Sequence, residues 1–95
     1  MEQLWRMAAD RGQAMAQAKV ALLCETELEQ PSQAFRLMKL AAEQGYTKAE
    51  NILGRYFLTG VGVEADLDQA KHWFASAAAK GHELAREELA ELNAA

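Results

Sequence analysis

Three segments of the chain share one pattern and recur at a nearly constant interval. They are LWRMAADRG (4–12), LMKLAAEQG (37–45) and WFASAAAKG (73–81), and each has two bulky apolar residues, an alanine pair and a closing glycine. The closing glycines are 33 and 36 residues apart. An interval of roughly this length that holds two helical stretches is typical of helix-turn-helix solenoids.

A second pattern follows each of these glycines. Alanine stands four residues on and a large apolar residue eight residues on, in the pairs Ala16 with Val20, Ala49 with Leu53, and Ala85 with Leu89. Small residues at fixed helical positions let two helix backbones approach closely, and bulky residues one turn away fill the space beside them. The sequence therefore predicts an all-α fold, in which antiparallel helix-turn-helix repeats stack as a short α-α superhelix, or solenoid.

Residues that favour helix starts and helix ends set the expected helix boundaries. Six helices are predicted, over residues 2–11, 13–25, 31–44, 47–59, 67–80 and 82–93. The glycines that close the three segments suit the left-handed position that ends a helix. Pro31 suits a first turn, where its missing N–H costs nothing. Thr47 with Glu50, and Asp66 with Gln69, have the spacing of capping boxes.

Length and charge narrow the class of protein. The chain has 95 residues, which favours a single domain, and 51% of them are hydrophobic, which is enough for a core. The net charge is −4 and the basic residues are scattered, so nucleic acid is not expected as a partner. One cysteine cannot form an internal disulfide. The sequence has neither a signal-peptide core nor a run long enough to span a membrane, so we expect a cytoplasmic protein with no membrane partner.

The run LGRYFLTGVGVEADLDQAKHWFASAAAKGH (53–82) resembles the Sel1-like repeat, a relative of the tetratricopeptide repeat. The matching positions are Leu53, Gly54, Gly60, Gly62, Val63, Asp66, Ala70, Trp73, Ala77, Ala78, Gly81 and His82. Phe57 and Phe74 stand where the family has tyrosine, and Gln69 where it often has lysine. The resemblance implies one domain, 1–95, made of a partial repeat (1–12), a degenerate repeat (13–45), a full repeat (46–81) and a C-terminal capping helix (82–95).

The Gly60-Val61-Gly62 stretch has an alternative interpretation as a phosphate-binding loop. Such a loop follows a strand and is itself followed by Lys-Ser or Lys-Thr, so that its backbone N–H groups line up on the phosphates. The pattern before these glycines is helical, and no Lys-Ser or Lys-Thr follows them. We therefore expect Gly60 to end a helix and Gly62 to let the chain reverse.

Few residues suggest chemistry. His72 and His82 are ten residues apart and Cys24 is far from both, which is not the spacing of a structural zinc site. Cys24 falls on an apolar helix face and Ser76 among small packing positions, so neither is expected to be a nucleophile. The acidic groups Glu25, Glu27 and Glu29, and Glu87, Glu88 and Glu91, are expected to be solvated faces. No catalytic residue, metal or cofactor is predicted. Hydrolase-like activity has been proposed for cysteine-rich relatives, but this chain lacks their cysteines.

The resemblance implies a protein-interaction module, an adaptor, scaffold or regulatory protein, that binds a protein or peptide on its concave face. In the related tetratricopeptide fold this face is lined by the first helix of each repeat. Transferring that register gives the candidate residues Met15, Leu22, Lys48, Asn51, Arg55, Leu58, Glu87 and Glu91. Arg55 is the favoured recognition residue, because the repeat pattern does not require it. Met15 and Leu22 have an alternative role, packing against the loop around 25–30. Self-association through the incomplete terminal repeats is the alternative function.

Overall fold

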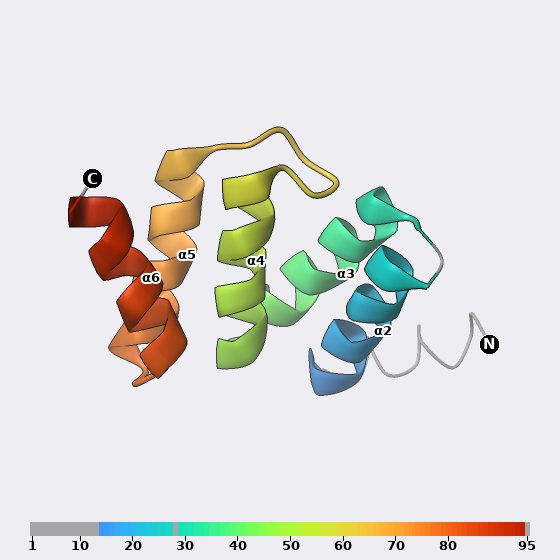
Figure 1. Cartoon of the computed structure of the whole chain (residues 1–95). Coiled ribbons are helices and arrows are strands. Elements are labelled where there is room, and N and C mark those ends of the chain that lie inside the picture. Colours follow the sequence, from blue (N-terminus) through green and yellow to red (C-terminus); the bar gives the residue numbers. More distant parts are fainter. Residues whose placement is uncertain (1–13, 28, 95) are drawn as a thin grey trace.

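The computed structural model describes residues 14–27 and 29–94, and within them the chain forms five α-helices and no strand (Figure 1). In chain order these are α2 (Ala14–Thr26), α3 (Pro31–Glu43), α4 (Thr47–Thr59), α5 (Leu67–Ala79) and α6 (Glu83–Ala94). The all-α prediction is confirmed, and the five corresponding helix boundaries agree to within one residue. The helix predicted over 2–11 and the partial repeat 1–12 lie outside the described residues.

Each helix packs against the next one in the chain, as a solenoid requires. The first helices of the two repeats, α2 and α4, run in the same direction, and α6 continues their series (Figure 1). The second helices, α3 and α5, run the opposite way and separate them. As a result, α2, α4 and α6 present equivalent positions in rows that cross the molecule.

Two turns between repeats are built alike. Gly45 and Gly81 have φ values of +88° and +91°, in the left-handed region that favours glycine. After α3, the Gly45 N–H donates to the Ala42 carbonyl and the Tyr46 N–H to the Ala41 carbonyl. The same pair of bonds closes α5, from Gly81 to Ala78 and from His82 to Ala77. These are Schellman motifs, and they confirm the predicted helix ends.

The predicted N-terminal signals are confirmed in part. Pro31 occupies the first turn of α3, and the Asp66 side chain accepts a hydrogen bond from the Gln69 N–H and caps α5. The second bond of a capping box does not form, because the Asp66 N–H donates to the Phe57 carbonyl. The capping box of Thr47 with Glu50 is wrong. Tyr46 is the residue that precedes α4, with no side-chain cap, and Glu50 is buried in a different polar contact.

The core consists of two buried clusters. Met38 and Leu53 are the largest fully buried side chains of the first cluster, among alanines of α2, α3 and α4. Phe74 of α5 is the largest buried side chain of the second cluster, which residues of α4, α5 and α6 line. Phe57 packs against both clusters and meets Phe35 edge to face, with ring centroids 5.3 Å apart. Burying a large apolar side chain contributes about 1.5–3 kcal/mol, so these few residues carry much of the stability.

Gly54 sets the distance between α4 and α5. A Cβ added here would lie 2.9 Å from two ring carbons of Phe74 and 3.2 Å from the Ala70 carbonyl oxygen. The absence of a side chain therefore lets the Phe74 ring lie directly on the α4 backbone. This is the close contact that the small-residue pattern predicts.

Gly60 ends α4 in the left-handed conformation, as expected, and a seven-residue loop then leads to α5. Gly62, at φ +69°, does more than reverse the chain. A Cβ at this position would lie 2.1 Å from the Pro31 carbonyl oxygen and 2.8 Å from the Phe35 Cβ. The loop after α4 therefore rests directly on the start of α3, toward which it extends in Figure 1.

Candidate functional site

Two rows of exposed side chains cross the first helices. Counted from the glycine before each first helix, the third residues are Met15, Lys48 and Leu84 and the tenth are Leu22, Arg55 and Glu91. All six are exposed, with Met15 at 54% and Leu84 at 60% of their full accessible surface. Positions three and ten are two helical turns apart and so share one side of a helix. We call these six residues the first-helix face.

Half of the large apolar side chains that are exposed in the described residues lie on this face. Six large hydrophobic residues are exposed in the described part of the chain, and three of them belong to the first-helix face: Met15, Leu22 and Leu84. Met15 and Leu22 lie on α2, and their exposure shows that the loop around 25–30 does not bury them. Exposed apolar side chains become part of a binding surface where they lie together, as Met15 and Leu22 do on one side of α2.

The sixth position after each glycine differs from helix to helix. Asn51, a predicted recognition residue, is only 4% exposed, and its Oδ1 has no hydrogen-bond partner among the described residues. Ala18 at the same position of α2 is also buried, whereas Glu87 of α6 is exposed. Asn51 is buried on α4, which packs between α3 and α5, whereas Glu87 is on α6, the last helix described. The structure thus separates Asn51 from the exposed candidates.

Leu58 is half-buried and packs against the second core cluster. It therefore contributes to the packing of α4 on α5 and α6 rather than to the first-helix face. The other predicted residues, Lys48, Arg55, Glu87 and Glu91, are all exposed.

Charge is unevenly distributed over the first helices. Lys19 on α2 and Lys48 and Arg55 on α4 are exposed cations, whereas the exposed face of α6 carries Glu87 and Glu91. Only two ion pairs form among residues 14–27 and 29–94, Lys80 with Glu50 and Arg86 with Glu83. Within that part of the chain, the three cations are not neutralised by a carboxylate contact.

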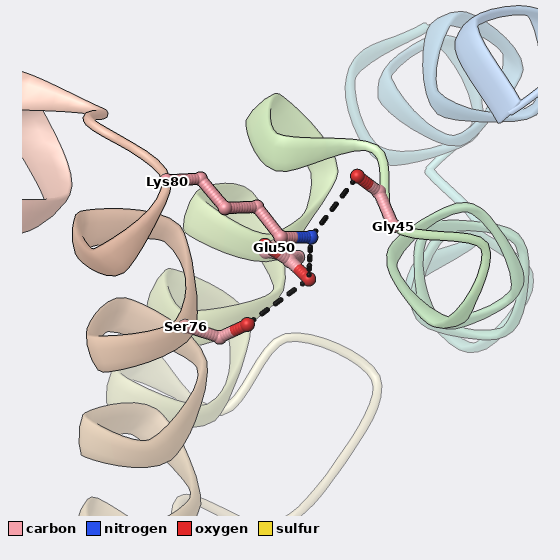
Figure 2. Close-up of polar contacts among 4 residues, drawn as sticks. All are labelled: Gly45, Glu50, Ser76 and Lys80. Carbon is pink, nitrogen blue, oxygen red and sulfur yellow. Dashed lines mark hydrogen bonds and ion pairs between the residues drawn. The ribbon is translucent and has the colours of Figure 1, made fainter.

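The second repeat contains a buried polar contact that the sequence analysis missed. Lys80 donates from Nζ to the Glu50 carboxylate at 2.9 Å and to the Gly45 carbonyl oxygen at 3.2 Å (Figure 2). Ser76 donates to the same carboxylate oxygen at 3.1 Å. The Glu50 side chain is 5% exposed and that of Lys80 is 40% exposed. These donors compensate for the lost hydration of one carboxylate oxygen, Oε2, whereas the buried Oε1 has no hydrogen-bond partner among the described residues.

An uncharged version of this contact lies one repeat earlier. Gln44 donates from Nε2 to the Gln17 side-chain oxygen, and Gln17 is buried. Gln17 and Glu50 are both five residues after a repeat glycine, and Gln44 and Lys80 both directly precede one. Comparing these polar positions between the repeats could have revealed the contact from the sequence alone.

Tyr56 forms a further polar link, between α4 and α2. Its hydroxyl donates to the Glu25 carboxylate at 2.9 Å, across 31 residues of sequence. Burial, reinforced by the hydrogen bond to Glu25 and by its charge, raises the pKa of Tyr56 well above its ordinary value of 10.0. The hydroxyl thus acts as a structural donor.

The residues considered for chemistry have structural positions. Cys24 is buried in the first core cluster, and Ser76 donates to Glu50. His82 precedes α6 and accepts a hydrogen bond from the Ala85 N–H at Nδ1, which caps that helix. In the described residues, no three of His, Cys, Asp and Glu gather in a way that could hold a metal ion. None of the helices described is long and apolar enough to cross a membrane.

Comparison with known proteins agrees with this architecture. A family model described as Sel1 repeat matches the chain twice, over residues 14–46 and 47–82. Among solved structures, the chain is similar to the crystal structure of a Sel1 repeat protein from Oxalobacter formigenes, with 35% sequence identity and a TM-score of 0.85. That similarity covers 90% of this chain and 67% of the other. Comparison with curated proteins gives no match.

Proposed function

This chain belongs to the Sel1 repeat family, whose fold is generally a protein-interaction module, and we propose that it binds a protein or peptide on its first-helix face as a non-catalytic adaptor or scaffold. The observation that carries the proposal is the pair of exposed rows on α2, α4 and α6. They place apolar and charged side chains on one side of a helical scaffold. An interface needs both, because apolar contacts supply affinity and charged groups supply orientation and specificity.

The distribution of polar chemistry supports binding over catalysis. Among the described residues, two of the three buried polar side chains, Glu50 and Gln17, hold helices together through hydrogen bonds. Cys24 is buried and Ser76 bonds to a carboxylate, so neither is paired with a histidine that could act as a base. The six residues of the first-helix face, in contrast, are all exposed.

Self-association through terminal repeats is the alternative, and it is less well supported. On α6, the residues equivalent to the buried Glu50, Asn51 and Gly54 are Arg86, Glu87 and Ala90, and all three are exposed. The two charged side chains would lose hydration if a second copy covered them. This side of α6 has the polar character of a terminal capping helix.

Site-specific photocrosslinking tests the proposed face. A photoreactive residue is introduced at Arg55 on α4 or, as a matched control, at Arg36 on α3, since both arginines are exposed. Crosslinked proteins from the host cell are then identified by mass spectrometry. We expect a discrete partner band from position 55 and none from position 36. Equal bands from both positions, or none from position 55, would contradict the proposal.

A further inference from the structure

We propose that the partner is an amphipathic helix with an apolar stripe and an acidic stripe side by side, lying along α2 and α4. The inference rests on the proposed function and goes further, because it specifies the chemistry of the partner. The apolar stripe would contact Met15 and Leu22, and the acidic stripe would contact Lys48 and Arg55.

The cationic part of the surface is the first argument. Lys48 and Arg55 are exposed on α4, and neither forms an ion pair with another residue of the described chain. Lys19 adds a third exposed cation from α2. Glu25 and Glu27 lie at the end of α2, but neither forms an ion pair with these three cations. Acidic side chains are the complementary chemistry.

The geometry of the two rows is the second argument. Met15 and Leu22 on α2 are seven residues apart, and so are Lys48 and Arg55 at the equivalent positions of α4. At 1.5 Å per residue, each pair spans about 10 Å along its helix. The two helices run in the same general direction (Figure 1), and the Tyr56 hydroxyl of α4 donates to Glu25 of α2, so the two rows belong to successive first helices that touch each other.

A helical partner fits two adjacent rows better than an extended one. Positions i and i+7 of a helix also lie about 10 Å apart on one face, and neighbouring stripes of a helix can differ in chemistry. An extended segment alternates its side chains between opposite faces, so it presents a single row to a surface. The paired rows therefore favour helix binding of the kind in which an amphipathic helix lays its apolar side on a surface.

The charges on α6 restrict where the acidic stripe of the partner can lie. The positions that are Lys48 and Arg55 on α4 are Leu84 and Glu91 on α6, where Glu87 is also exposed. A carboxylate that is attracted to α4 is repelled by α6, so the acidic stripe is confined to the side of α4 that adjoins α2. Like charges across an interface act against incorrect placement.

Selection from a random peptide library tests the inference. A phage library of 16-residue peptides is selected on the full chain, and the enriched peptides are measured by fluorescence anisotropy at low and high salt. Peptides should be enriched in Leu, Ile or Phe repeated at helical spacing with Glu or Asp beside them. Their affinity should fall with added salt and fall about tenfold or more in Lys48→Glu/Arg55→Glu. The matched control Arg36→Glu/Lys39→Glu, on exposed positions of α3, should bind as the parent does.

The outcomes separate this inference from the function it rests on. Basic or uncharged peptides, no enrichment, or affinities that are unchanged in Lys48→Glu/Arg55→Glu would overturn the acidic helix. If photocrosslinking at position 55 still captures a partner, the interaction function stands and only the partner chemistry is wrong. If position 55 captures nothing as well, both proposals fail. Circular dichroism of each variant checks that the helices remain.

Discussion

Lys80 reaches Glu50 from the same place in its repeat from which Gln44 reaches Gln17. The first contact joins two opposite charges, the second two neutral amides, and each ties the end of a second helix to the first helix of its own repeat. Lys80 also bonds the Gly45 carbonyl oxygen, in the turn between the repeats. The two repeats thus make a polar contact at the same pair of positions, although the pair is charged in one repeat and neutral in the other.

We expect Lys80→Gln to lower the free energy of unfolding by about 1–2 kcal/mol, because it removes the charged partner of a buried carboxylate. The loss stays moderate because the Lys80 side chain is 40% exposed and its charge is partly screened. The double variant Glu50→Gln/Lys80→Gln copies the neutral pair of the first repeat and should recover part of the loss. Urea denaturation measures all three, with Lys39→Gln as the exposed control. A double variant less stable than the single one would show that the two contacts are not interchangeable.

Gly62→Ala should cost more stability than Gly81→Ala. Both glycines have positive φ values, so either substitution introduces backbone strain of about 1–2 kcal/mol. Only at position 62 would the new Cβ also meet backbone atoms, 2.1 Å from the Pro31 carbonyl oxygen, whereas position 81 has nothing within 4 Å. Thermal unfolding of the two variants measures the difference. Equal losses would mean that the loop does not rest on α3.

Stability should fall as the pH rises above about 10, and Tyr56 should account for part of that fall. The folded chain raises the pKa of Tyr56 above its ordinary value of 10.0, so the folded state holds this proton more tightly than the unfolded state does. The stabilising contribution is therefore complete below pH 10 and is lost as the pH rises beyond it, by up to about 1.4 kcal/mol per pH unit. Urea denaturation between pH 8 and 11 should show a shallower decline in Tyr56→Phe. Parallel declines would argue against the raised pKa.

Gly54→Ala should destabilise the chain by about 1–3 kcal/mol through overpacking against Phe74. The smaller side chain in Phe74→Leu leaves room for the added methyl group. The cost of Gly54→Ala should therefore be lower in a Phe74→Leu background. A double-mutant cycle by urea denaturation measures this coupling, and strictly additive losses would show that the two positions do not compete for space.

The sequence predicted the helices well because their signals are local. Pro31, Asp66 and the repeat glycines mark where helices start and stop, and each acts through its own backbone or that of near neighbours. Glu50 was misassigned for the opposite reason. Its spacing from Thr47 fits a capping box, but Lys80, 30 residues away, offers a stronger charged partner.

The candidate surface was predicted in part. Positions three and ten are exposed on all three first helices, because they point away from every neighbouring helix. Asn51 and Leu58 lie closer to the edge of that face, where burial depends on how tightly α4 packs against its neighbours. The position of a residue in the repeat does not predict the distance between α4 and its neighbouring helices. That distance is set by contacts such as the one between Gly54 and Phe74.

The loop contact at Gly62 has a consequence for how the chain unfolds. In many repeat arrays, stability is a sum of separate units and the interfaces between neighbours, and the units can melt one by one. Here the loop inside the second repeat covers the first turn of α3, the second helix of the first repeat. Unfolding of the second repeat would expose the first turn of α3 to solvent. Unfolding of α3 would in turn remove the surface on which the loop packs. The two repeats should therefore melt as a single cooperative transition.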